Sequence, residues 1–286
     1  MRIRWHLFLI LPVLVSLALF VAPQVAFLRG SLFENLGYGE IGSTLTLENY
    51  RQFLTDSFYL HSLMLTVGLS IATVVVSIAI GFPIAYGLAR STSRWRSAWL
   101  TLLIASSLVT VVIKALGLMV LLSVNGPVNN ALMAVGVINT PIHMLSNNVG
   151  VTLGLAHYTL PLVVLVLFSV IQTIPKNLEE AASSLGAGPW RAAYRVVLPL
   201  AMPGLVAGGL MAFNLAMGTF TSTALLGGGK VLTLPILIER KAILEVNYPA
   251  AATISLMLLL AGMLVNMFAL GVVQRMQRGT PAGAVA

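Results

Sequence analysis

Six long apolar segments divide the chain, at about residues 7–28, 60–89, 97–124, 149–173, 201–226 and 249–273. Three of them contain no Asp, Glu, Lys, Arg or His, and the second, third and fourth contain one such residue each: His61, Lys114 and His157. A helix needs about 20 mostly apolar residues to cross the hydrocarbon layer of a membrane. The segments are too long and too continuously apolar for the alternating strands of a membrane barrel. The sequence therefore predicts an all-α membrane protein with six transmembrane helices.

The composition excludes the common soluble classes. Hydrophobic residues make up 58% of the 286 residues and charged residues only 8%, whereas a soluble globular domain has about 45–50% and about 25%. So few charges cannot cover a water-facing surface, which excludes a soluble enzyme, and a disordered protein needs the opposite bias. The absence of cysteine excludes disulfides and thiolate metal sites, and the four histidines lack a metal-ligand spacing.

The first apolar segment has the basic start of a secretory signal, because Arg2 and Arg4 precede it. However, the run from Leu7 to Leu28 is longer than the roughly 7–15 residues of a signal's apolar core. No clear small-residue cleavage site follows it. We therefore expect an uncleaved helix, and a single transmembrane domain over residues 1–286.

Basic residues are distributed unevenly between the two sides of the membrane. With a cytoplasmic N-terminus, the inner segments 1–6, 90–96, 174–200 and 274–286 hold ten basic and two acidic residues. The outer segments hold five basic and six acidic residues. An excess of Lys and Arg marks the cytoplasmic side, so we expect both termini in the cytoplasm. The net charge of +8 is thus a topology signal and requires no nucleic acid.

Two short helices are expected in the outer segments. Thr46 to Leu54 has the pattern of an amphipathic helix that leads toward the second span, and the stretch 128–138 follows the turn signal Asn125-Gly126-Pro127.

The inner loop at 174–200 has the pattern of two short helices separated by a break. Pro175 is suited to start a helix, and Glu179 and Glu180 then lie in its early turns, where the helix dipole favours anions. Gly186 is suited to end it. The elements expected in order are a helix at 176–185, a break at 186–189 and a second helix at 190–197. This element is too polar to enter lipid and too short to be a domain, so it is suited to dock into a groove on a soluble partner.

The same loop resembles the EAA motif of the membrane subunits of binding-protein-dependent ABC importers. That motif is Glu-Ala-Ala, three residues, Gly, nine residues, Ile, one residue and Leu-Pro. The corresponding residues here are Glu180-Ala181-Ala182, Gly186, Val196 and Leu198-Pro199. The one departure is Val196, which keeps an apolar β-branched side chain where the motif has Ile.

The resemblance implies that this loop couples the membrane helices to an ATPase. The implied coupling residues are Glu179, Glu180, Ala181, Ala182, Gly186, Leu198 and Pro199. Glu180 would pair with a basic residue of the ATPase, the two alanines would allow close approach, and Gly186 would form the turn after the helix. The alternative is a loop helix that merely caps the fourth and fifth spans.

Further stretches resemble the spermidine/putrescine permease branch of that family, which includes opine and phosphonate importers: 81–90, 125–129 and 224–229. The resemblance implies the type I ABC importer permease fold and a multi-pass subunit of the bacterial inner membrane. The implied partners are an ABC ATPase dimer, a second permease chain of different sequence and a periplasmic binding protein. The implied function is alternating-access import of a small polar solute that is polyamine-like, an opine or a phosphonate.

The chain has no nucleotide-binding loop of its own. Its one Gly-Lys pair in a glycine run is Gly229-Lys230, but Val231 follows where Ser or Thr is required, and Ala224 stands at the position of the first glycine. We therefore expect a transport subunit rather than an enzyme. It binds no cofactor or metal, and ATP and Mg are used by the separate ATPase chain.

Four residues within the spans are candidates for the translocation path. Lys114 is the only strongly charged residue well inside a span, so it either faces the path or is a structural lysine whose ammonium snorkels or binds carbonyls. Asn214 and Asn266 either line the path or bond across helices. Tyr158 is the fourth candidate, since its ring is able to guide a cation.

Two other classes compete with a permease subunit. A membrane-embedded enzyme needs clustered acids, histidines or Ser-His pairs in the spans, and none stand out in the sequence. A stand-alone secondary transporter is usually built from more spans, inverted repeats and intramembrane carboxylates.

Overall fold

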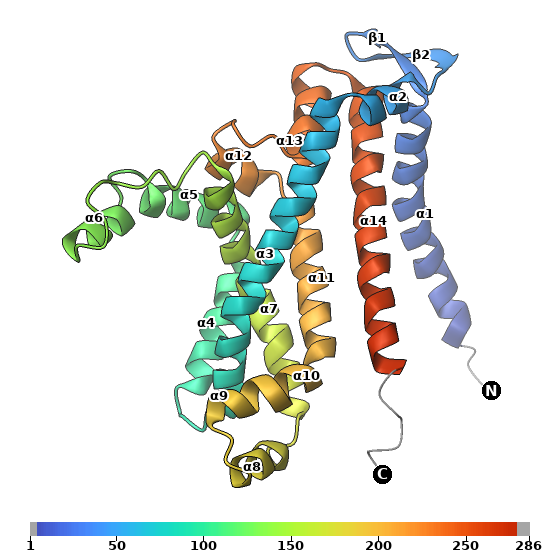
Figure 1. The fold of residues 1–286 in the computed structure, drawn as a ribbon. Helices are drawn as coiled ribbons and strands as arrows, with labels where there is room; N and C mark the ends of the chain where they lie inside the picture. Colours follow the sequence, from blue (N-terminus) through green and yellow to red (C-terminus); the bar gives the residue numbers. More distant parts are fainter. Residues whose placement is uncertain (1–4, 279–286) are drawn as a thin grey trace. The chain divides into compact units, whose positions relative to one another are not determined.

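The computed structural model describes residues 5–278, with side chains from Ile10 to Gly271 except Leu11. Arg2 and Arg4, and the tail after Arg278, lie outside the described residues, so their part in the predicted orientation stays a prediction. Helices dominate the described part of the chain, and two short strands form a small sheet (Figure 1).

Five helical stretches among the described residues are long and apolar enough to cross a membrane, and a bent pair of helices adds a sixth if it counts as one span. The five are Pro12–Ser31, Ser57–Arg90, Val111–Ala134, Asn148–Thr173 and Tyr248–Gly271, and the pair is Pro189–Leu200 with Met202–Gly218. The predicted helical membrane fold is confirmed, with five or six candidate spans among the described residues where six were expected.

The chain divides into two compact units. The first contains residues 5–63 and 234–261, and the second contains residues 64–233 and 262–278. Two long helices, α3 (Ser57–Arg90) and α14 (Tyr248–Arg278), begin in the first unit and continue into the second.

The first unit contains a β-hairpin that the sequence interpretation missed. After the long apolar helix α1 (Trp5–Ser31), strand β1 (Phe33–Gly37) pairs antiparallel with β2 (Glu40–Leu45). Gly37, Tyr38 and Gly39 at the turn all have positive φ, and two of the three are glycines, which adopt this conformation without steric cost.

Short helices complete the first unit. The predicted amphipathic helix is confirmed as α2 (Glu48–Thr55), whose buried Phe53 stacks on Tyr59 with the ring centroids 5.5 Å apart. The Tyr50 hydroxyl lies 2.6 Å from that of Ser31, which ties α2 to the end of α1. Helix α13 (Leu234–Glu239) leads into the π-helical turn η2 (Arg240–Leu244).

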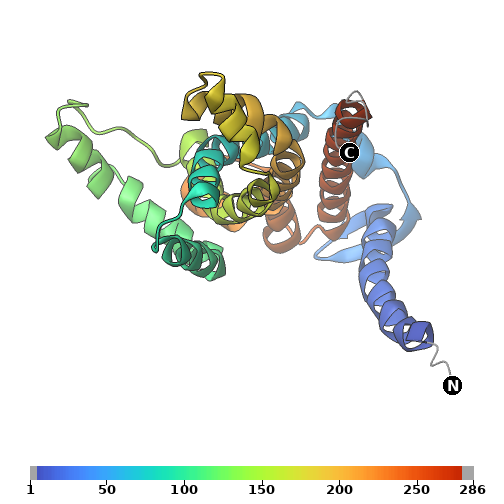
Figure 2. The same ribbon diagram turned by 90° about the horizontal axis from the view of Figure 1, so that it is seen from below.

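The core of the second unit lies between α7 (Asn148–Thr173) and α11 (Met202–Gly218), which are side by side in Figures 1 and 2. Buried residues of α3, α7 and α11 meet there: Phe82, Ala85, Val163, Val164, Leu167, Leu205 and Ala212. Gly204 of α11 allows this approach, because a Cβ at that position would lie 2.9 Å from the side chain of Val170. Small residues at the contacts of membrane helices allow their backbones to approach closely.

The third apolar segment contains two helices where one was expected. Helix α4 (Arg96–Leu108) ends before Val109 and Thr110, which are extended, and α5 (Val111–Leu122) begins after them. The break falls within five β-branched residues in succession, 109–113, which slightly disfavour a helix because they lose rotamer freedom there. Helix α6 (Pro127–Ala134) follows and overlaps the predicted stretch 128–138. Together α5 and α6 form an arm that leads away from α7 in both views (Figures 1 and 2).

The fifth apolar segment is also divided. Helix α11 ends at Gly218, and a separate short helix, α12 (Thr221–Gly227), follows. The left-handed residue Gly228 ends α12, which agrees with the role of glycine after a helix.

Candidate functional site

The loop predicted as helix, break and helix has this structure. Helix α8 (Asn177–Ser184) follows Pro175 and Lys176, with Glu179 and Glu180 in its first turn, where their charges complement the helix dipole. The Ser183 hydroxyl donates a hydrogen bond to the Glu179 carbonyl, and that of Ser184 to the Glu180 carbonyl. Both hydroxyls thus find their acceptors within α8.

Gly186 ends α8 in a Schellman motif. Its φ is +85°, its N–H donates to the Ser183 carbonyl at 2.9 Å, and the N–H of Ala187 donates to the Ala182 carbonyl at 3.0 Å. Both bonds satisfy carbonyls that the helix end leaves free. A Cβ at Gly186 would meet no atom within 4 Å, so the need for glycine comes from the backbone conformation alone.

The second half of the loop turns the chain back toward the membrane. Helix α9 (Pro189–Ala192) has a proline at its first position and continues through the π-helical turn η1 (Ala193–Val197) into α10 (Leu198–Leu200). A bend of 74° then separates this segment from α11. Pro199 and Pro203 flank the bend and lack the N–H that a continuous helix needs.

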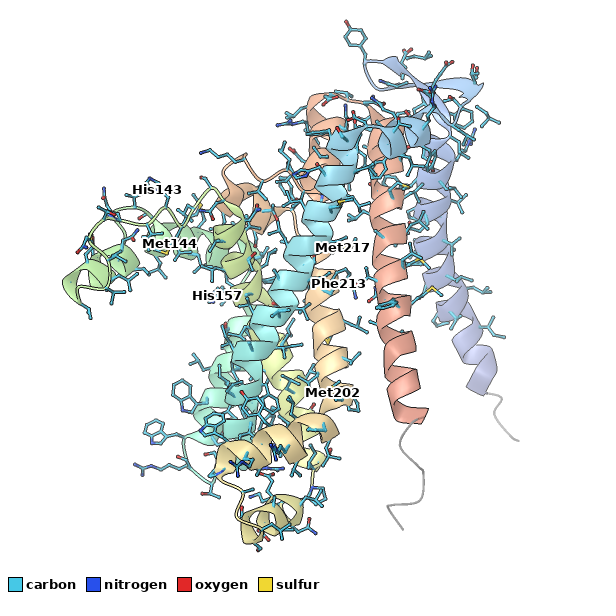
Figure 3. The ribbon with its side chains drawn as sticks, viewed as in Figure 1. His143, Met144, His157, Met202, Phe213 and Met217 are labelled. Atoms are coloured by element: carbon cyan, nitrogen blue, oxygen red, sulfur yellow. The ribbon has the colours of Figure 1, made fainter. Side chains whose placement is uncertain are left out.

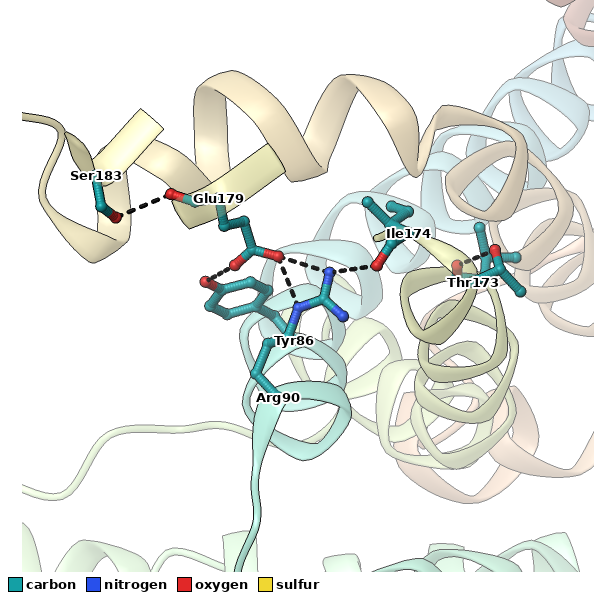
Figure 4. Close-up of polar contacts among 7 residues, drawn as sticks. Tyr86, Arg90, Thr173, Ile174, Glu179 and Ser183 are labelled. Atoms are coloured by element: carbon teal, nitrogen blue, oxygen red, sulfur yellow. Dashed lines mark hydrogen bonds and ion pairs between the residues drawn. The ribbon is translucent and has the colours of Figure 1, made fainter. Parts of the chain in front are cut away.

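Glu179 points toward its own chain, where it binds the end of α3 (Figure 4). Its carboxylate accepts a hydrogen bond of 2.7 Å from the Tyr86 hydroxyl and another of 2.7 Å from Arg90 Nε. Arg90 Nη2 lies 2.6 Å from Glu179 Oε1 and also donates to the carbonyl of Ile174, at the end of α7. Both side chains of the ion pair are only 15% exposed. We call Tyr86, Arg90 and Glu179 the α3–α8 clamp.

Glu180 differs from Glu179, because it is exposed and has no ion pair within the described part of the chain. It lies on the edge of a hollow of about 440 Å³ together with the α3–α8 clamp, Lys176 and Ser183. The two adjacent glutamates of α8 therefore have different environments. Glu179 binds residues of its own chain, and Glu180 faces outward.

Large apolar side chains of the same loop are exposed. Leu185 is 90% exposed, Trp190 63% and Tyr194 52%. Ala181 is exposed as well, and Ala182 borders a shallow hollow that also contains Leu185 and Arg191. We call Glu180, Ala181, Ala182, Leu185, Trp190 and Tyr194 the α8 surface. By contrast, Leu198 packs against the core of the second unit.

Two predicted path residues come together at the contact of α5 with α7. Lys114 of α5 is only 7% exposed, and its ammonium lies 5.6 Å from the centre of the Tyr158 ring of α7. No hydrogen-bond partner reaches Lys114 Nζ within the described part of the chain. Neither a bond to a carbonyl nor an exposed ammonium is seen for Lys114 among the described residues, and its place on the translocation path stays a prediction.

The other two predicted path residues bind each other. The amide nitrogens of Asn214 (α11) and Asn266 (α14) each donate to the other's side-chain oxygen, at 3.0 and 2.8 Å. Each nitrogen also donates to a carbonyl four residues earlier in its own helix. All four donor hydrogens are in use, as the cross-helix alternative expects.

Tyr86 and Arg90 were not among the predicted site residues. Arg90 served only as a topology signal in the sequence interpretation, and nothing in the sequence indicates that it pairs with a residue 89 positions away. Among the described residues, no group of three His, Asp or Glu side chains is placed to hold a metal ion.

Apolar helices with a helix-break-helix element ahead of α11 are the arrangement expected of a multi-pass membrane subunit. Residues 78–280 match the family of binding-protein-dependent transport system inner membrane components. The chain belongs to this family and is a permease subunit of an ABC importer in the inner membrane.

Curated relatives agree with this family. The chain is 32% identical to the spermidine/putrescine transport system permease protein PotB of Escherichia coli K12, over 85% of the chain and 88% of that protein. It is 38% identical to PotB of Haemophilus influenzae over half of each chain. It is also 37% identical to a putative 2-aminoethylphosphonate transport system permease protein, PhnU of Salmonella paratyphi A, over 46% of each chain.

Solved structures show the same fold. A chain of a bacterial ABC transporter that imports the acidic polysaccharide alginate superposes with a TM-score of 0.76 at 18% identity, covering 95% of this chain and 96% of that one. A second structure of an alginate transporter, in complex with its alginate-bound periplasmic protein, gives a TM-score of 0.77 over 95% of each chain. The expected type I ABC importer permease fold is thereby confirmed.

Proposed function

We propose that the α8 surface is where this permease docks onto its ATPase. The observation that carries the proposal is the exposure of Leu185, Trp190 and Tyr194 on a polar loop. Apolar side chains of this size gain free energy when a partner covers them. Exposed Glu180 at the rim is free to pair with a basic residue of that partner, and Ala181 and Ala182 leave room for a close approach.

The α3–α8 clamp gives the docking surface a mechanical connection to the membrane. Arg90 binds Glu179 of α8 and the carbonyl of Ile174 at the end of α7, so one guanidinium joins the ends of two spans to the docking helix. Tyr86 and Arg90 then act as positioning residues: a displacement of α8 by the ATPase moves the ends of α3 and α7 with it. Gly186, Leu198 and Pro199 set the turn after α8 and the re-entry of the chain into the membrane.

The remaining subunits follow from this role. ATP and Mg are bound by a separate ATPase dimer, and this chain contributes no catalytic residue. A second permease chain completes the pathway, and a periplasmic binding protein delivers the solute. Closure of the ATPases opens the pathway outward, and hydrolysis resets it inward. In this arrangement residues 1–286 form one transmembrane domain with both termini in the cytoplasm.

The solute is a small polar molecule of the kind for which the relatives are named, a polyamine or an aminophosphonate. Lys114 and Tyr158 border the translocation path in this proposal. Asn214 and Asn266 hold α11 against α14, which keeps the wall of the path together.

Co-purification tests the proposed function. The tagged permease, expressed with its neighbouring transport subunits and extracted in mild detergent, is expected to bring down an ATPase chain whose hydrolysis is stimulated by the loaded binding protein. A partner-free permease that still transports a solute into liposomes would contradict the proposal and favour a stand-alone secondary transporter.

A further inference from the structure

Lys114 is a buried cation without a partner in the described part of the chain. It is only 7% exposed, and its ammonium nitrogen is one of two buried side-chain polar atoms in the described residues that lack a hydrogen bond. An ammonium that is buried without a hydrogen-bond acceptor is unfavourable, because it loses its hydration. The Tyr158 ring, 5.6 Å from the ammonium, offsets part of this cost through a cation–π contact. An anion beside it would keep the lysine charged.

The chain itself offers no such anion nearby in sequence. The 122 residues from Ser57 to Leu178, which include Lys114, contain no Asp or Glu. The carboxylate that ends this stretch, Glu179, is already bound by Arg90 and Tyr86. An anionic partner for Lys114 therefore has to come from another molecule.

His157 gives this cation an exposed neighbour. It precedes Tyr158 on α7 (Figure 3), is exposed, and its ring lies within electrostatic reach of the Lys114 ammonium. It is the tenth of the 26 residues of α7, which places it at the depth of the hydrocarbon layer. An exposed imidazole at that depth is costly against lipid, so this face of α7 meets water or protein.

We propose that Lys114, with His157 and Tyr158, forms a recognition site for the acidic group of the solute on the translocation path. The ligand class is a carboxylate or phosphonate, as in a zwitterionic amino acid derivative or an aminophosphonate. The ammonium of Lys114 repels a solute that carries only positive charges, so of the two solute classes proposed above this site favours the aminophosphonate over an unmodified polyamine. This inference rests on the proposed function, since it assumes that the path passes this face of α7.

The absence of cysteine from the chain allows a test that needs no knowledge of the solute. A His157→Cys permease, in membrane vesicles with its cysteine-free partner subunits, is treated with an anionic and a cationic methanethiosulfonate reagent. The ratio of the two reaction rates is divided by the same ratio for Tyr38→Cys, which changes a fully exposed side chain on the β-hairpin, outside both proposed sites. Lys114→Met and Lys114→Arg are each combined with His157→Cys. Co-purification of the ATPase is measured on the same samples, so that failure of the proposed function is seen separately.

The site predicts that the thiol introduced by His157→Cys reacts and prefers the anionic reagent by about tenfold or more, since a nearby positive charge attracts one reagent and repels the other. Lys114→Met abolishes the preference and Lys114→Arg retains it. No reaction with either reagent would mean that position 157 is covered by lipid or protein rather than open to a water-filled path, and would overturn the proposal. A reaction without anionic preference would overturn it as well, because it would mean that a carboxylate of the second permease already neutralises Lys114.

Discussion

The guanidinium of Arg90 lies 2.6 Å from the carboxylate of Glu179 and joins the last residue of α3 to the first turn of α8. This ion pair spans 89 residues of sequence and is shielded from solvent on both sides. It separates the roles of two adjacent glutamates, because Glu180 beside it is exposed. Substitution of the two glutamates is therefore expected to have different effects.

Glu179→Gln is expected to lower the thermal stability of the permease complex, and Glu180→Gln is not. The first change leaves Arg90 partly buried without its counter-ion, and hydrogen bonds to charged groups contribute about 1.5–3 kcal/mol. The second change removes a charge that no described residue pairs with. Thermal unfolding of both variants in detergent measures the difference. Equal midpoints for the two variants would show that the α3–α8 clamp does not stabilise the helix.

The same pair of variants is expected to separate in function. Glu180→Gln weakens binding of the ATPase. Glu179→Gln leaves binding in place but lowers the number of solute molecules imported per ATP hydrolysed, because α8 no longer moves the end of α3. Uptake and hydrolysis measured together in proteoliposomes give this ratio. An unchanged ratio in Glu179→Gln would mean that the movement reaches the membrane by another route.

Gly186→Val is expected to impair uptake more than Gly186→Asn. No atom lies within 4 Å of a Cβ at this position, so side-chain size alone causes no clash. A non-glycine residue with left-handed φ costs about 1–2 kcal/mol, and Asn tolerates this conformation better than a β-branched residue. Uptake rates at equal expression test the order. If both variants were equally active, the Schellman motif would have no part in coupling.

Leu185→Asp is expected to reduce the amount of ATPase that co-purifies with the permease. The side chain is 90% exposed in the isolated chain, so the change does not disturb the core, but it places a charge in a contact that we propose is apolar. Leu36→Asp on the β-hairpin, where Leu36 is 59% exposed, is the matched control. Equal loss of ATPase in both variants would point to a general defect in assembly.

The amide pair of Asn214 and Asn266 is expected to stabilise the contact of α11 with α14. Replacing either residue by Leu leaves the other amide in an apolar span with fewer hydrogen-bond partners. Replacing both leaves no unpaired amide. A double-mutant cycle on unfolding is predicted to give a coupling energy of about 0.6–1.7 kcal/mol, the range for polar contacts between membrane helices. Additive effects of the two changes would refute the cross-helix bond as a stabilising contact.

Local signals in the sequence predicted local structure well. Pro175, Gly186 and Pro189 predicted α8, the break and α9, because glycine and proline restrict or free the backbone where they stand. The long apolar runs predicted the spans because hydrophobicity acts residue by residue. The break at Val109 and Thr110 was missed because an unbroken apolar run does not reveal where a helix stops. The hairpin at Tyr38 was missed because its strands are short and contain glycine and polar residues, without a clear alternation of apolar side chains.

Contacts between distant residues could not be predicted. The sequence indicates that Arg90 and Glu179 are charged but not that they meet, because their meeting depends on how α3, α7 and α8 pack. The same holds for Asn214 and Asn266, where both a path role and a cross-helix bond fitted the sequence. The residues predicted to couple the membrane helices to the ATPase also lie in two different places. Glu180, Ala181 and Gly186 lie on or beside α8, whereas Leu198 packs against the core of the second unit.

Site-specific photo-crosslinking tests the docking of α8 on the ATPase most directly. A photoreactive amino acid replaces Leu185 in the complete transporter, and a second sample carries it at Tyr38, which is fully exposed on the β-hairpin. The account predicts an adduct of the permease with the ATPase chain from position 185 and none from position 38. An assembled, transporting complex that gives no ATPase adduct from position 185 would contradict it.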